Sequence, residues 1–189
     1  MNAASGQEPV RRLFFALWPD ADTAGVLQAR AQQAHDACGG RVMRLDTLHL
    51  TLAFLGAVGG RRIPALRALL SAGERFGGTL VLDRFGYFRG PRIVWAGSSA
   101  PVSWLHTLHE RLWADIEPIG LARPAERFRP HISLLRKVAH GTLPPWPAGG
   151  AIIWRAQRLV LVASTSQATG ACYEVLGEQR LPMTPEPGR

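Results

Sequence analysis

Two short segments of this chain repeat one pattern, and the repeat limits the folds open to it. Residues 49–52 read H-L-T-L and residues 131–134 read H-I-S-L, 82 positions apart, each inside an apolar stretch. Because side chains alternate between the two faces of a strand, residues i and i+2 share a face. We therefore expect His49 and Thr51 on one face of a first strand, and His131 and Ser133 on one face of a second. The repeat predicts two related lobes, each contributing one such strand.

Strand-like and helix-like stretches follow one another without strict strand–helix–strand repetition, which favours an α+β fold with antiparallel sheets. Strands are expected over residues 11–18, 48–55, 80–88, 93–96, 131–135, 152–163 and 172–176. Helices are expected over 20–37 with Asp20 or Asp22 as the N-cap, over 62–76, and over 102–116. We expect one bilobal domain over residues 11–181 and loose ends at 1–10 and 182–189.

The chain carries a formal net charge of +8, nearly all of its positive charge being arginine, because Lys137 is the only lysine. The planar arginine fork donates two hydrogen bonds at once and suits phosphate, although coding bias produces the same composition. No apolar run reaches the ~18–20 residues that span a bilayer, and the N-terminus lacks the apolar core of a signal peptide. We expect a cytoplasmic protein that does not contact membranes, in which Cys38 and Cys172 are reduced thiols.

Two imidazoles, each beside a hydroxyl, are suited to hydrolysis of a cyclic phosphodiester. The reaction requires a base that takes a proton from water and an acid that protonates the leaving oxygen, and histidine titrates near neutrality. The two groups must lie on opposite sides of the phosphorus, which two lobes facing across a groove provide. The hydroxyls of Thr51 and Ser133 can donate to the non-bridging oxygens.

The paired histidine–hydroxyl motifs resemble those of the two-histidine phosphoesterase superfamily. Within it, the chain is most similar to the RNA 2',3'-cyclic phosphodiesterases, once called 2'-5' RNA ligases. The similarity covers roughly residues 11–181, and it is carried by R-L-F-F-A-L-W-P (12–19), H-L-T-L-A-F-L-G (49–56), G-Y-F-R-G-P-R-I-V-W-A-G (86–97) and R-P-H-I-S-L-L-R (129–136). The resemblance implies a bilobal fold with pseudo-two-fold symmetry and a central groove. It also implies hydrolysis of 2',3'-cyclic phosphate ends of RNA to 2'-phosphates, without metal or another cofactor.

The resemblance further implies a role for each site residue. His49 is the general acid toward the 3'-oxygen, and His131 is the general base toward water. Phe54 stacks on the terminal base, and Arg136 contacts phosphate. Both lie five residues after their histidines, so strict alternation places them on the opposite face. They reach the groove only if each strand ends, twists or bulges there.

The sequence leaves the roles of several other residues open. His106 and His109 share a face of the expected 102–116 helix, which allows a metal pair or, more simply, a packing contact. His35 and His140 are expected in solvent. Trp146 is expected to pack against a lobe or to line the groove, and Arg89 and Arg92 to lie in a solvated turn or at the groove mouth. The alternatives to RNA-end hydrolysis are 2'-5' ligation, hydrolysis of a small cyclic nucleotide, and non-catalytic binding of RNA ends or nucleotides; a monomer is expected.

Overall fold

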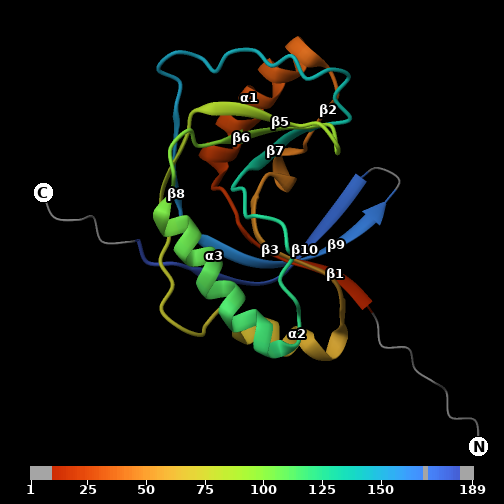
Figure 1. The fold of residues 1–189 in the computed structure, drawn as a ribbon, viewed down its shortest axis with the longest axis vertical. Helices are drawn as coiled ribbons and strands as arrows, with labels where there is room; N and C mark the ends of the chain where they lie inside the picture. Colours follow the sequence, from red (N-terminus) through yellow and green to blue (C-terminus); the bar gives the residue numbers. More distant parts are fainter. Residues whose placement is uncertain (1–9, 168–169, 184–189) are drawn as a thin grey trace, which may run out of the picture.

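One large antiparallel sheet runs through the whole molecule. The computed structural model describes residues 10–167 and 170–183. Within these residues, strands pair in the order β10-β9-β1-β3-β7-β6-β5, β2 lies beside β7, and β4 and β8 form a separate two-stranded sheet. All of these strand pairings are antiparallel. The architecture is therefore α+β with antiparallel sheets, as the sequence predicts (Figure 1).

The first lobe contains four strands of the large sheet. They are β1 (Val10–Leu17), β3 (Leu50–Gly59), β9 (Arg158–Gln167) and β10 (Gly170–Arg180). Helix α3 (Ser103–Ile116) packs against β3, and the short helix α2 (Ile63–Ala68) follows β3 at the same end of the molecule (Figure 1). Single 3₁₀ turns at Gly60–Arg62 and Glu117–Ile119 adjoin these two helices.

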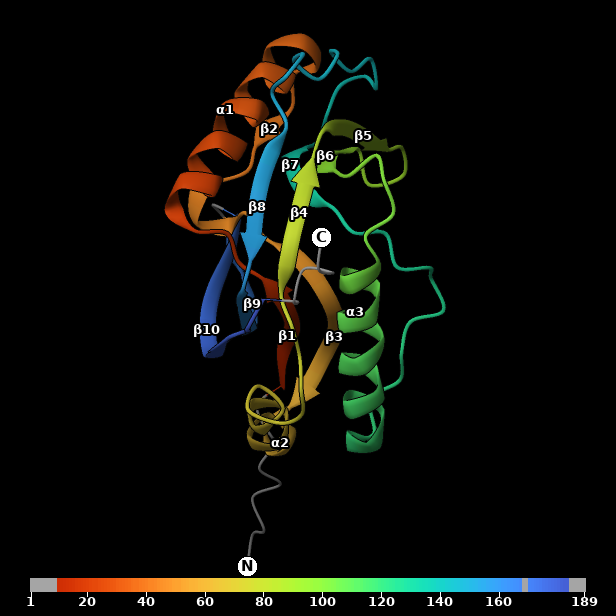
Figure 2. The ribbon, with the colours of Figure 1, turned by 90° about the vertical axis from the view of Figure 1, so that its left-hand side faces the viewer.

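The second lobe contains the other half of the large sheet. Its strands are β2 (Arg41–Val42), β7 (Ile132–Arg136), β6 (Ile93–Gly97) and β5 (Arg84–Phe88). Helix α1 (Ala21–Cys38) packs against β7, and a 3₁₀ turn (Leu45–Thr47) follows β2. The ribbon of β4 (Gly78–Leu82) and β8 (Ile152–Ala156) runs lengthwise between α1 and α3 (Figure 2).

Helices α1 and α3 each pack on the lobe opposite to that of the strand before them, and the two lobes meet at one backbone pairing. Helix α1 follows β1 of the first lobe but covers β7 of the second, whereas α3 follows β6 of the second lobe but covers β3 of the first. Strands β3 and β7 pair at Leu50 and Ile132, whose side chains are both fully buried. One large apolar cluster therefore extends through both lobes, and a smaller one is formed by Phe14, Ala16, Val160 and Val162.

Helix α1 agrees with the expected 20–37 helix to within one residue at each end. The Asp20 carboxylate accepts a hydrogen bond from the Thr23 amide at 2.7 Å, which satisfies one of the free N–H groups of the first turn. Gly39 ends the helix with φ 66°, a left-handed conformation that favours glycine.

Three expected elements have different bounds in the structure. The strand expected over 80–88 is two strands, since Asp83 accepts hydrogen bonds from the Ser99 amide and hydroxyl and separates β4 from β5. The strand expected over 152–163 likewise divides at Gln157, whose carbonyl accepts from the Leu181 amide. The helix expected over 62–76 ends at Ala68, and the buried Arg75 guanidinium instead donates to the Leu69 and Ala72 carbonyls.

The ends of the domain also differ from the expected boundaries. Val10, expected in a loose leader, begins β1, and residues 1–9 lie outside the described part of the chain. Pro182, expected in a loose tail, accepts a hydrogen bond from the Gly77 amide at 2.8 Å, and residues 184–189 again lie outside the description. In the described ranges, no helix has the length and apolar character needed to cross a membrane.

Candidate active site

The pairing of β3 with β7 brings the two histidine motifs together. His49 and His131 each directly precede a strand. The sequence predicts both inside their strands, His49 as the second residue of 48–55 and His131 as the first residue of 131–135. Because Leu50 pairs with Ile132 in antiparallel register, extending that register by one residue places His49 opposite Ser133 and His131 opposite Thr51. Leu50 and Ile132 point into the core, so the histidines and hydroxyls face the other way. The local two-fold axis thus passes between the motifs.

Both imidazoles are held by the same backbone hydrogen bond. His49 Nδ1 lies 2.7 Å from the Thr47 carbonyl, and His131 Nδ1 lies 2.7 Å from the Arg129 carbonyl. A carbonyl only accepts, so Nδ1 carries the hydrogen in each ring and donates it. In the neutral form, Nε2 of each histidine is therefore a free acceptor, which is the atom a base uses.

Aromatic rings surround both histidines, and they do so more completely at His49. His49 stacks on Phe14 and Trp18 at ring-centroid distances of 4.9 and 5.3 Å, and the ring of Tyr173 meets it edge-on. Phe88 packs edge-on against His131 at 4.9 Å. Burial lowers the pKa of His49 from its ordinary value to about 4, and it also lowers the pKa of His131.

The positive charge of Arg136 also lowers the pKa of both histidines, because it disfavours a second cation nearby. We expect NMR titration of the free protein to find His49 neutral from pH 8 down to roughly pH 5. Arg136→Gln removes the cation and should raise the pKa of both rings, whereas Arg155→Gln, on the outer β4–β8 ribbon, should raise neither. A His49 that titrates near its ordinary value in the wild-type protein would contradict this prediction.

A β-bulge in each motif strand turns a further side chain toward the site. In β3, Ala53 pairs with Phe15 and Thr51 pairs with Ala16, so Leu52 is an extra residue. In β7, Leu135 pairs with Val94 and Ser133 pairs with Trp95, so Leu134 is an extra residue. An extra residue reverses the alternation beyond it.

Phe54 and Arg136 therefore share the face of Thr51 and Ser133, which meets the geometric condition that the sequence set for them. The two bulges and these two side chains are again 82 positions apart. The bulges thus belong to the internal repeat, and Phe54 and Arg136 are equivalent positions of the two lobes.

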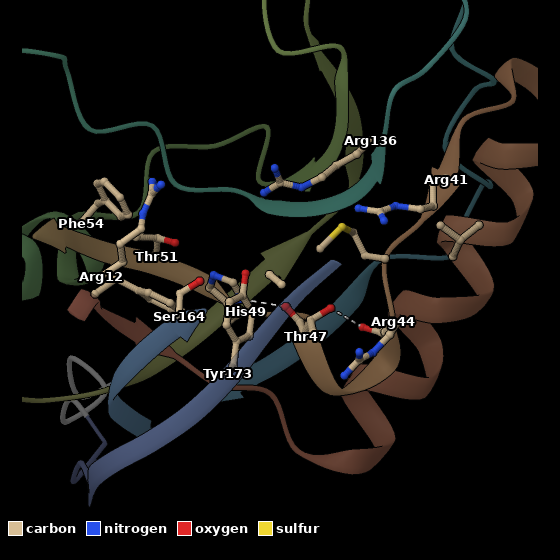
Figure 3. Close-up of a pocket in the computed structure, with 14 residues that line it drawn as sticks. Arg12, Arg41, Arg44, Thr47, His49, Thr51, Phe54, Arg136, Ser164 and Tyr173 are labelled. Carbon is tan, nitrogen blue, oxygen red and sulfur yellow. Dashed lines mark hydrogen bonds between the residues drawn. The ribbon is translucent and has the colours of Figure 1, made fainter. Parts of the chain in front are cut away.

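A pocket of about 480 Å³ opens beside His49 (Figure 3). Four of the predicted site residues line it: His49, Thr51, Phe54 and Arg136. His131 and Ser133 are not among its lining residues; they lie next to it across the β3–β7 pairing. The structure therefore places the predicted residues next to one another on one face of the sheet. The pocket lies beside the His49 motif rather than the His131 motif.

Three arginines of the pocket were not singled out from the sequence. Arg12 of β1 lies over the Phe54 ring at 5.5 Å, Arg41 belongs to β2, and Arg44 pairs with Asp46. In the described part of the chain, no ion pair joins Arg12, Arg41 or Arg136 to a carboxylate. Together they give the pocket a positive field suited to an anionic ligand. The Arg12 position was within reach of sequence reasoning, since Arg12 and Phe14 share a face of the first expected strand.

The remaining candidate residues are not part of the pocket lining. Trp146 packs against Phe85 and donates to the Gly150 carbonyl at 3.0 Å, away from the pocket lining. Arg92 donates to the Val138 carbonyl at 2.7 Å, and Arg89 lies exposed in the same turn. His109 is buried with both ring nitrogens hydrogen-bonded, and no cluster of three or more metal-ligating side chains occurs in residues 10–167 and 170–183. Cys38 and Cys172 are free thiols.

A two-lobed antiparallel fold with one histidine motif from each lobe is the architecture of the two-histidine phosphoesterase class that the sequence resembles. Residues 17–95 match the family model described as LigT like Phosphoesterase. The chain is 36% identical over 137 residues to the RNA 2',3'-cyclic phosphodiesterase of Escherichia coli K12, a match that covers 71% of this chain and 77% of that protein. The chain belongs to the LigT-like phosphoesterase family.

Solved structures agree over nearly the whole chain. The apo form of E. coli LigT superposes with a TM-score of 0.77 at 33% identity, covering 94% of this chain and 100% of that one. E. coli LigT complexed with 3'-AMP gives a TM-score of 0.80 at 30% identity, covering 92% and 99%. The pseudo-symmetric bilobal fold expected from the sequence is therefore confirmed.

Proposed function

We propose that this protein hydrolyses 2',3'-cyclic phosphate ends of RNA to 2'-phosphates, with His49 and His131 as acid and base and with no metal taking part. The observation that carries the proposal is the pair of imidazoles directly before two adjoining strands, each with Nδ1 donating to a carbonyl and Nε2 left as the acceptor. The curated E. coli relative is named as an RNA 2',3'-cyclic phosphodiesterase, and a related structure contains 3'-AMP. These names support RNA ends as the substrate class.

The proposed step needs one proton transfer on each side of the phosphorus. Neutral His131 accepts a proton at Nε2 from water, and the water oxygen forms a bond to phosphorus. The bond between phosphorus and the 3'-oxygen breaks, and His49 delivers a proton from Nε2 to that oxygen. A 2'-phosphate and a free 3'-hydroxyl remain, and one water molecule has been consumed.

The lowered pKa of His49 suits an acid that forms only with substrate present. In the free protein this imidazole is neutral because it is buried. An anionic phosphodiester beside it raises its pKa, so protonation accompanies substrate binding.

The neighbouring side chains account for the binding of a nucleotide end. The hydroxyls of Thr51 and Ser133 donate to the non-bridging oxygens, where charge accumulates during the reaction. Arg136 donates to the phosphate, and Phe54, with 46% of its surface exposed, offers a ring on which the terminal base stacks. Both histidines come from one chain, so we propose a monomer, and the free thiols fit a reducing cytoplasm.

Turnover of an oligoribonucleotide with a 2',3'-cyclic phosphate end tests the proposal directly. We expect full activity in excess EDTA, with a 2'-phosphate as the product. Loss of activity in EDTA and its recovery with a divalent cation contradicts the mechanism. Joining of a 5'-hydroxyl strand identifies a ligase, turnover confined to mononucleotides identifies a small-molecule enzyme, and tight binding without turnover identifies a binding protein.

A further inference from the structure

The bulge at Leu52 of β3 is held by a side chain from a helix outside the pocket. His109 of α3, only 5% exposed, donates from Nδ1 to the Leu52 carbonyl at 2.8 Å. Leu52 is the extra residue of the bulge and has no pairing partner in β1. A buried carbonyl without a donor is costly, so this hydrogen bond stabilises the bulged backbone in place of the missing pairing.

Other contacts fix the His109 ring in the form that can donate. Arg123 Nη2 lies 3.0 Å from His109 Nε2, and because arginine can only donate, Nε2 accepts and Nδ1 carries the hydrogen. Phe128 stacks on the imidazole at 3.9 Å, with the two planes 5° apart. Glu110 pairs with Arg123 and holds the guanidinium in place. The ring therefore has one tautomer and one orientation.

The bulge in the second lobe is satisfied in an equivalent way. The Leu134 carbonyl, at the extra residue of β7, accepts a hydrogen bond from the Met43 amide at 2.8 Å. The bulges at Leu52 and Leu134 thus each have one donor from outside the strand pair. In the second lobe the donor is the backbone amide of Met43, which a side-chain substitution leaves in place. In the first lobe the donor is the side chain of His109, which a substitution removes.

We propose that His109 is a positioning residue that holds the β3 bulge and thereby directs Phe54 toward the terminal base of the substrate. The inference rests on the proposed function for the role of Phe54, but not for the bulge itself. Only Ala53 separates Leu52 from Phe54, and the bulge at Leu52 decides which face of the sheet the phenyl ring occupies. His109 does not touch the pocket, so its loss affects base binding rather than proton transfer.

Steady-state kinetics on the cyclic-phosphate oligonucleotide test this role. His109→Leu removes the donor and should raise KM by roughly 5- to 150-fold, the range for losing one stacked base, with kcat changed by less than about threefold. His109→Asn keeps a donor where Nδ1 lies and should restore KM to within about threefold of wild type. The double variant with Phe54→Ala should raise KM no further than Phe54→Ala alone, because both changes remove one contact.

Amide hydrogen exchange tests the bulge without any substrate. The Ala53 and Phe54 amides should exchange faster in His109→Leu and at the wild-type rate in His109→Asn. If the wild-type protein shows no turnover, the proposed function fails while this measurement still decides the role of His109. Unchanged exchange and KM in His109→Leu, or effects that multiply with Phe54→Ala, overturn the inference.

A milder variant tests the same role in case His109→Leu does not fold. Arg123→Met leaves the imidazole in place but frees Nε2, so the ring is no longer confined to the donating tautomer. We expect a rise in exchange at Ala53 and Phe54, and in KM, that is smaller than for His109→Leu. Wild-type values for both quantities in Arg123→Met, with His109→Leu unfolded, also overturn the inference.

Discussion

Replacing His49 or His131 by alanine is expected to lower kcat on a 2',3'-cyclic phosphate end by roughly 10²- to 10⁴-fold each, the range for losing one positioned proton donor or acceptor. The two rings act on one step from opposite sides of the phosphorus. The double variant should therefore be little slower than the slower single variant. Single-turnover rates with saturating oligonucleotide measure this effect apart from binding.

Substrate binding should survive the loss of either histidine, because the arginines of the pocket and Phe54 remain. His140→Ala, which changes an exposed histidine outside the pocket lining, serves as the matched control and should leave kcat unchanged. A His131→Ala protein with wild-type kcat refutes the assignment of His131 as the base. A His49→Ala protein with wild-type kcat refutes the assignment of the acid.

Arg136→Ala is expected to raise KM for the same oligonucleotide by about 10- to 150-fold, which corresponds to losing one hydrogen bond between charged groups. Arg136 lines the pocket and is placed there by the bulge at Leu134. Arg136→Lys should recover only part of the loss, because an ammonium keeps the charge without the planar fork. The salt dependence of binding should weaken by about one unit of slope.

Arg155→Ala removes the same charge from the outer face of β8 and is the control for net charge. We expect its KM and salt slope to match those of the wild type to within about twofold. Equal effects of Arg136→Ala and Arg155→Ala show that only the overall positive charge matters, and they contradict a direct phosphate contact.

Local patterns in the sequence were sufficient for several elements of the fold. The apolar run at 11–18 predicts β1, and Asp20, one of the two expected N-caps, marks the start of α1. These features depend on residues a few positions apart. The two-stranded β4–β8 sheet was not predicted, because its strands come from residues 78–82 and 152–156, which are far apart in the sequence. The same limit explains the merged strand expected over 80–88.

The active site likewise has features that local sequence patterns predict and features that they do not. Side-chain alternation along an extended chain was enough to place Thr51 beside His49 and Ser133 beside His131. It could not place Phe54 and Arg136, because a bulge depends on how two strands pair and cannot be recognised in the sequence of either strand alone. Nor could it find Arg41 or the bond from His109 to Leu52, which join segments far apart in the chain.

By itself, then, the sequence determined that two histidine–hydroxyl strands exist and that each presents both groups on one face. That result follows from the period of an extended chain, which is local. Only the tertiary structure decided that the strands pair at Leu50 and Ile132, that each bulges one residue after its hydroxyl, and that the arginines gather around one pocket. Register and bulges are set by hydrogen bonds to partner strands and by burial of the opposite face, and both depend on segments that meet only in the folded protein.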